Sequence, residues 1–98
     1  MKIKFRDVSQ GIVLARAVVE IVPGIYINEI TVLNDSVNDD IRIEFPTKSF
    51  KGKDGRVHHM NIIMFESEDK QTLFEIDIKE AYRNWRLDTK KVLVYESE

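Results

Sequence analysis

Hydrophobic and polar residues alternate along much of the first 65 positions, the spacing typical of β-strands with one buried face. We expect strands in five segments: 2–8, 12–22, 25–33, 41–45 and 57–65. The side chains expected to face inward from the first, second and fourth segments are Ile3 and Phe5, then Val13, Ala15, Ala17, Val19 and Ile21, and then Ile41, Ile43 and Phe45. The fifth segment differs, because both of its faces are largely apolar.

Residues that favour turns separate these segments. Pro23-Gly24 combines a fixed φ with a residue that tolerates positive φ, and it predicts a β-hairpin between 12–22 and 25–33. Pro46 lacks a backbone donor and ends the fourth strand or marks a sheet edge. A loop over 47–56 follows, and its Asp54-Gly55 turn dipeptide is compatible with a long hairpin arm.

After Phe65 the hydrophobic spacing changes to that of a helix. Ser67 is a suitable N-cap, and the acidic residues that follow it suit the first turn of a helix. The residues that recur at intervals of three to four are Leu73, Phe74, Ile78, Ala81, Tyr82 and Trp85. We therefore expect an amphipathic helix over 67–86, followed by a short strand or a tail at 92–95.

A run of strands followed by one helix favours an α+β fold. We expect one domain over residues 1–98, with an antiparallel sheet of four to five strands and the helix packed on it. Apolar residues make up 43% of the chain and charged residues 33%, as in ordinary globular proteins. Charges occupy the positions where a signal peptide would be apolar, and no apolar run reaches the length of a membrane span, so we expect a cytoplasmic protein.

The residue types that carry most catalytic and metal chemistry are scarce. There are no cysteines, and the two histidines, His58 and His59, are adjacent in an expected strand, where neighbouring side chains point to opposite faces. Asp39-Asp40 lies in a turn cluster with no nearby base, and the four glycines form no phosphate-binding loop. We expect no enzyme activity, cofactor, metal or small-molecule substrate.

Positive charge is concentrated in one segment of an otherwise acidic chain. The net charge is -2, whereas residues 48–59 carry Lys48, Lys51, Lys53 and Arg56 against Asp54, a local charge of +3. Such a segment is either a solvated loop or a contact for phosphate groups. The helix also carries cations, namely Lys70, Lys79, Arg83 and Arg86, but acidic residues are interleaved with them, as on a solvated face.

Three stretches in order resemble the SpoVG family, the stage V sporulation (septation regulator) proteins of bacteria. The first is ARAVVEIVPGIYINEITVLND at residues 15–35, where Tyr26 to Val32 stand at the position of that family's aromatic strand. The second is IRIEFPTK at residues 41–48, and the third is the Asp54-Gly55 turn ahead of a helix. The resemblance covers about residues 12–85.

The resemblance implies a nucleic-acid-binding regulator, of DNA or RNA, without catalysis. Lys48, Lys51, Lys53 and Arg56 would then neutralise phosphates, while Phe50 either stacks on an unpaired base or packs back onto the sheet. We also expect a homodimer formed by strand pairing, because the apolar strands exceed what one helix can cover. The alternative is a protein-interaction module of the same fold without nucleic-acid binding, favoured by the acidic balance and by Ser49, where that family has a second basic residue.

Overall fold

Six strands are followed by one helix, which confirms the α+β class. The computed structural model describes the backbone of residues 2–96 and the side chains of residues 2–88. The elements are β1 (Ile3–Gln10), β2 (Val13–Val22), β3 (Ile25–Asp35), β4 (Asp40–Glu44), β5 (Thr47–Lys51), β6 (Val57–Asn61) and α1 (Glu68–Glu96).

The first four strands form one antiparallel sheet in the order β1-β2-β3-β4. The predicted hairpin at Pro23-Gly24 is confirmed, and Gly24 adopts the positive φ of 83° that its turn requires. Strand β3 contains an irregularity that simple alternation does not predict. Ile27 pairs with Val19 and Ile30 pairs with Ala17, so β3 has one extra residue between the pairs. This bulge lets both isoleucines face the core.

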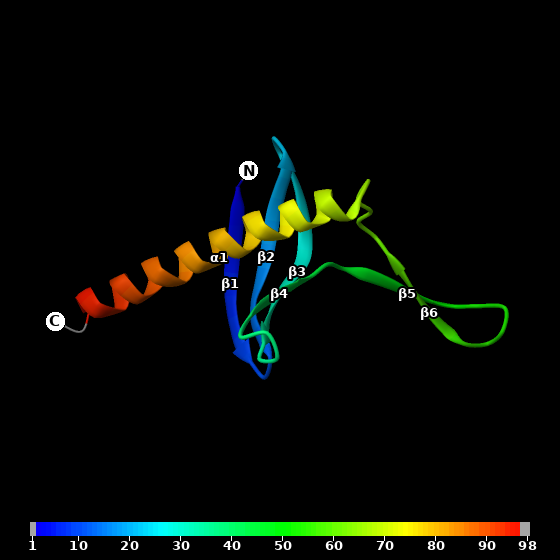
Figure 1. Ribbon diagram of the computed structural model, residues 1–98, viewed down its shortest axis with the longest axis horizontal. Coiled ribbons are helices and arrows are strands. Elements are labelled where there is room, and N and C mark those ends of the chain that lie inside the picture. Colours follow the sequence, from blue (N-terminus) through cyan, green and yellow to red (C-terminus); the bar gives the residue numbers. More distant parts are fainter. Residues whose placement is uncertain (1, 97–98) are drawn as a thin grey trace.

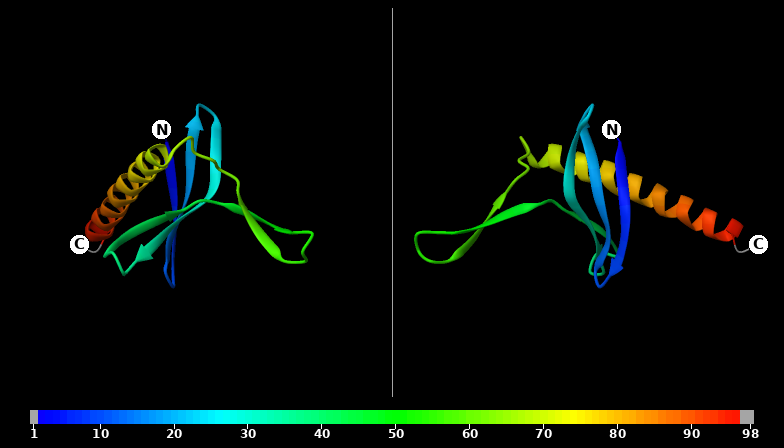
Figure 2. Two further views of the ribbon diagram at one scale, coloured as in Figure 1. Left: turned by 45° about the vertical axis from the view of Figure 1, so that its right-hand side comes forward. Right: turned by 180° about the vertical axis from the view of Figure 1, so that it is seen from behind.

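The helix α1 crosses one face of this sheet and leaves the opposite face without a covering helix (Figures 1 and 2). The hydrophobic core lies between the two layers. Its buried members are Ala15, Ala17, Val19, Ile30, Val32, Ile43, Ile78 and Tyr82, and Ile3, Phe5, Ile41 and Phe45 pack against them. The predicted inward faces are thus confirmed at these strand positions. Val13 and Ile21 are exceptions. Val13 is only partly buried and lies outside the core cluster, and Ile21, two residues from the β2–β3 turn, is exposed.

Ser67 caps the helix as predicted: its Oγ accepts a hydrogen bond from the backbone N–H of Lys70 at 3.3 Å. The predicted end near Arg86 is wrong, since α1 continues to Glu96 and includes the 92–95 segment, expected as a strand or tail. No glycine or proline follows Gly55 in the sequence, so no residue there breaks the helix. Leu73 was expected on the buried face but is exposed.

The predicted strand over 57–65 is shorter, because β6 ends at Asn61, and all five of its residues are exposed. Strand β6 pairs only with β5, in a separate two-stranded sheet, so no second layer covers its apolar side chains. Residues 47–51, expected as part of a loop, form the partner strand β5.

The molecule is elongated. Its radius of gyration is 16.0 Å, whereas a compact chain of this length has about 13 Å. Figure 1 shows why: the β5–β6 ribbon projects from one end of the body, and the C-terminal part of α1 projects from the other.

Candidate nucleic-acid interface

The ribbon of β5, β6 and their connecting turn, residues 47–61, is called the arm here. It leaves the body just after Pro46 and extends well away from the main sheet (Figures 1 and 2). Its strands pair in register from Thr47 with Asn61 to Lys51 with Val57. The hairpin arm that the sequence allowed is therefore present.

Three aromatic rings hold the base of the arm against the body. Phe45 follows β4, Phe65 follows the arm and Phe74 lies on α1, and their ring centroids are 5.2 to 5.9 Å apart. The backbone N–H of Ile62 also donates a hydrogen bond to the carbonyl oxygen of Pro46 at 3.4 Å. Both ends of the arm are thus anchored, so its direction is set by the body.

Asp54 organises the tip of the arm. Its carboxylate accepts a hydrogen bond from the backbone N–H of Arg56 at 2.9 Å and lies 3.1 Å from Nε2 of His58. These two contacts, the backbone bond first, lower the pKa of the Asp54 carboxyl below its ordinary value. The only acidic side chain of the arm is therefore bound within the turn, and it forms no ion pair with a lysine or arginine of the described chain.

Phe50 does not pack back onto the main sheet. It lies opposite His58 in the ribbon, and the two rings stack with centroids 5.5 Å apart and an interplanar angle of 26°. Lys48 and Met60 share this face, since they alternate with Ser49 and His59. Phe50 is 42% exposed. The arm therefore presents an aromatic surface beside a lysine, the combination that single-stranded nucleic acids bind.

All four basic residues predicted as phosphate contacts, Lys48, Lys51, Lys53 and Arg56, are exposed on the arm. Lys48 and Lys51 lie on opposite faces of β5, while Lys53 and Arg56 lie in or beside the turn. Among the side chains that the structure describes, none of these cations has an acidic partner.

Three cations of the helix, unlike those of the arm, have acidic partners. Arg83 donates to a carboxylate oxygen of Asp40 at 2.7 Å, and Lys79 lies 3.8 Å from the same carboxylate. Arg86 pairs with Asp7 at 3.0 Å. These cations attach α1 to the edges of the sheet, so they are less available to an external phosphate than those of the arm.

The adjacent histidines point to opposite faces of the arm, as expected. His58 contacts Asp54 and Phe50, whereas Nδ1 of His59 lies 3.3 Å from the hydroxyl of Ser49. Within the described part of the chain, no group of three or more histidine, aspartate or glutamate side chains is arranged to hold a metal ion.

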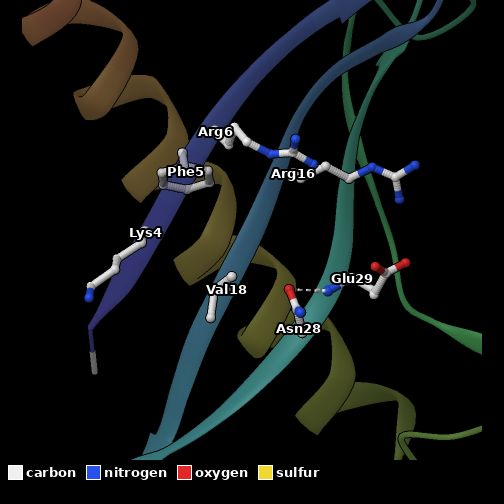
Figure 3. Close-up of a pocket in the computed structure, with 7 residues that line it drawn as sticks. All are labelled: Lys4, Phe5, Arg6, Arg16, Val18, Asn28 and Glu29. Carbon is white, nitrogen blue, oxygen red and sulfur yellow. Dashed lines mark hydrogen bonds between the residues drawn. The ribbon is translucent and has the colours of Figure 1, made fainter.

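A second basic surface lies on the sheet face opposite α1. Lys4 and Arg6 alternate outward on β1, and Arg16 lies outward on β2, beside a hollow that Figure 3 shows. The sequence analysis did not identify these residues as a site. The signal was present, since each cation follows the period of two in its strand.

No helix in the described part of the chain has the length and apolar character needed to cross a membrane. Comparison with protein-family models, curated proteins and solved structures finds no match to this chain. A functional proposal therefore rests on the sequence pattern and on the geometry of the arm.

Proposed function

We propose that this chain is a SpoVG-like regulator that binds DNA or RNA through its arm, in the cytoplasm and without catalysis. The observation that carries the proposal is the contrast between the two sets of cations. Lys79, Arg83 and Arg86 of α1 are paired with Asp40 or Asp7, whereas the cations of the arm have no acidic partner among the described side chains. Unpaired, exposed cations on a projecting ribbon are suited to phosphate groups.

The shape of the arm supports the same proposal. A two-stranded ribbon is narrow enough to enter the major groove of a duplex, and its aromatic face can stack on an unpaired base. The arm is firmly anchored at its base, so binding does not first require the body to rearrange. The resemblance to SpoVG proteins points to regulation of septation, sporulation or gene expression as the process served.

A homodimer is part of the proposal. An isolated two-stranded ribbon is marginally stable in water, and this one exposes Val57, on the face opposite Phe50, and has the exposed Ile62 beside it. A second copy would cover these side chains and double the number of cations. Light scattering at micromolar concentration is expected to give twice the 11.5 kDa of one chain. A mass of one chain would contradict dimer formation.

The test of nucleic-acid binding is a mobility-shift series with duplex DNA, single-stranded DNA and RNA over a range of salt concentrations. The arm variant Lys48→Ala/Arg56→Ala is compared with the helix variant Lys79→Ala/Arg83→Ala, which removes the same charge. We expect the arm variant to bind all sequences more weakly. Two lost phosphate contacts should lower the slope of log K against log salt by about 1.8 on duplex DNA.

The three outcomes have different meanings. A smaller loss in the helix variant supports the arm as the contact surface, because neighbouring acids already offset the helix charges. A larger loss in the helix variant contradicts the arm and identifies α1 as the contact. If the parent protein binds no nucleic acid, the alternative holds, and the fold is a protein-interaction module.

A further inference from the structure

The open face of the main sheet carries two arginines that lie directly opposite one another. Arg6 on β1 and Arg16 on β2 are cross-strand partners, and both side chains extend on the side away from α1. Like charges in this position destabilise a sheet unless something else compensates them. The chain has 17 acidic residues, so the pair is not explained by a shortage of carboxylates.

The side chains around this pair form a recess. A hollow of about 200 Å³ is bordered by Lys4, Arg6, Arg16, Val18, Asn28 and Glu29. The hydroxyl of Thr31 accepts a hydrogen bond from Arg16 at 2.7 Å and holds that guanidinium in place. The Asn28 side-chain oxygen accepts from the N–H of Glu29, which leaves its amide N–H groups as donors. Most polar groups of the recess are therefore hydrogen-bond donors.

The single acid of the recess, Glu29, forms no ion pair with the arginines. Figure 3 shows its carboxylate far from Lys4 and on the same side as the guanidinium of Arg16. Neither arginine of the pair forms an ion pair with Glu29 or with any other described side chain. Lys4 Nζ lies 5.8 Å from the centroid of Tyr26, a half-exposed ring. The face thus combines three cations and an accessible aromatic ring with two acids, Glu20 opposite Tyr26 and Glu44 opposite Thr31.

The basic row is directed toward the arm. Figure 3 shows Arg6 reaching from β1 across β2 and Arg16 reaching from β2 across β3. Both therefore point toward β4, the strand from which the chain continues into the arm. In the left view of Figure 2 the sheet stands between α1 and the arm, so α1 does not separate the open face from the arm.

From this charge complementarity we infer that the open sheet face is a second contact for single-stranded nucleic acid, with a phosphate group held between Arg6 and Arg16. Guanidinium groups bind phosphate oxygens in pairs of parallel hydrogen bonds. A single strand can bend a phosphate into a recess, whereas a stiff duplex lies across it. This inference rests on the proposed function and extends it from the arm to the body.

The test uses the full chain with twelve-residue oligonucleotides of deoxythymidine and uridine. The variant Arg6→Gln/Arg16→Gln is compared with Lys79→Gln/Arg83→Gln, which removes the same charge from the helix, and with Lys51→Gln/Lys53→Gln on the arm. Two lost phosphate contacts lower the slope of log K against log salt by about 1.4 on a single strand. The affinity ratio of parent to variant should therefore grow about 25-fold when the salt concentration falls from 1 M to 0.1 M. The arginine Nε–H signals in NMR spectra report contact with phosphate directly.

We expect the sheet variant to show this loss and the Nε–H signals of Arg6 and Arg16 to shift during titration of the parent protein. The inference fails alone if the arm variant loses affinity while the sheet variant stays within twofold of the parent. Both the inference and the proposed function fail if the parent binds neither these oligonucleotides nor the duplex DNA of the mobility-shift series. Binding of an oligoglutamate peptide in that case, dependent on the two arginines, would assign the face to an acidic protein partner instead.

Discussion

Ile78 is expected to make the largest single contribution to docking of the helix on the sheet. It is fully buried among residues of β2, β3 and β4, whereas most other apolar side chains in the described part of α1 are partly exposed. The change Ile78→Ala removes three carbon atoms, worth about 2.4 kcal/mol at 0.8 kcal/mol for each buried methylene. The cavity left behind adds to this, and we expect a loss of about 3–4 kcal/mol.

The size of this loss can be judged against the whole stability of a small domain, about 5–15 kcal/mol. The assay is urea unfolding followed by the fluorescence of Trp85, the only tryptophan, whose ring centroid lies 5.4 Å from that of Phe5 on β1. Trp85 therefore reports separation of α1 from the sheet. All variants are measured at one protein concentration, because a dimer gains stability with concentration.

Leu73→Ala is the matched control, since Leu73 lies on the same helix but is 61% exposed. It is expected to cost no more than about 0.5 kcal/mol, the usual range for surface changes. Ile78→Val, expected to cost about 0.5–1.5 kcal/mol, gives a measurable variant if the alanine form does not fold. Equal losses in Ile78→Ala and Leu73→Ala would refute the packing described here.

Two further predictions concern the arm and the edge of the sheet. A Cβ on Gly52 would lie 2.7 Å from the ring of His58, so Gly52→Ala should displace that ring. The free energy of unfolding should change little. Unchanged histidine NMR signals would contradict this prediction. The backbone N–H of Ile41, followed by the charges of Lys79 and Arg83, lowers the pKa of the Asp40 carboxyl. Its charge therefore stabilises the fold above about pH 4, and this contribution is lost as the pH falls through the lowered pKa. Asp40→Asn should weaken the acid dependence of stability, and an unchanged dependence between pH 5 and pH 2 would exclude this role.

Period-two alternation predicted the sheet well where each strand has one buried face. Ala15, Ala17 and Val19 are buried as expected because β2 is central and packs under α1. Alternation failed at Asn28-Glu29, where Glu29 adopts a positive φ of 64° and shifts the register by one residue. A glutamate is an unusual residue for that conformation, so no local signal indicates the bulge.

The arm shows a different limit of sequence reasoning. Apolar residues over 57–65 were interpreted as one long strand, but β6 ends at Asn61 and Phe65 turns back to pack with Phe45 and Phe74. Hydrophobicity alone does not distinguish a residue that packs on the body from one on an exposed ribbon. Only the tertiary contacts of Phe65 decide where the arm begins and ends.

The position of each cation could be predicted from the sequence, but whether it has an acidic partner could not. Interleaved acids on α1 indicated a solvated face, but Arg83 and Arg86 pair with Asp40 and Asp7, which are 43 and 79 positions away. Because those two acids hold the helix, they are not available to the cations of the arm or of the open face. The fold thus uses Asp7 and Asp40 to attach α1. The cations of the arm (Lys48, Lys51, Lys53 and Arg56) and of the open face (Lys4, Arg6 and Arg16) have no acidic partner among the described side chains. Local clusters of unpaired cations allow a chain with a net charge of -2 to present positive surfaces to phosphate.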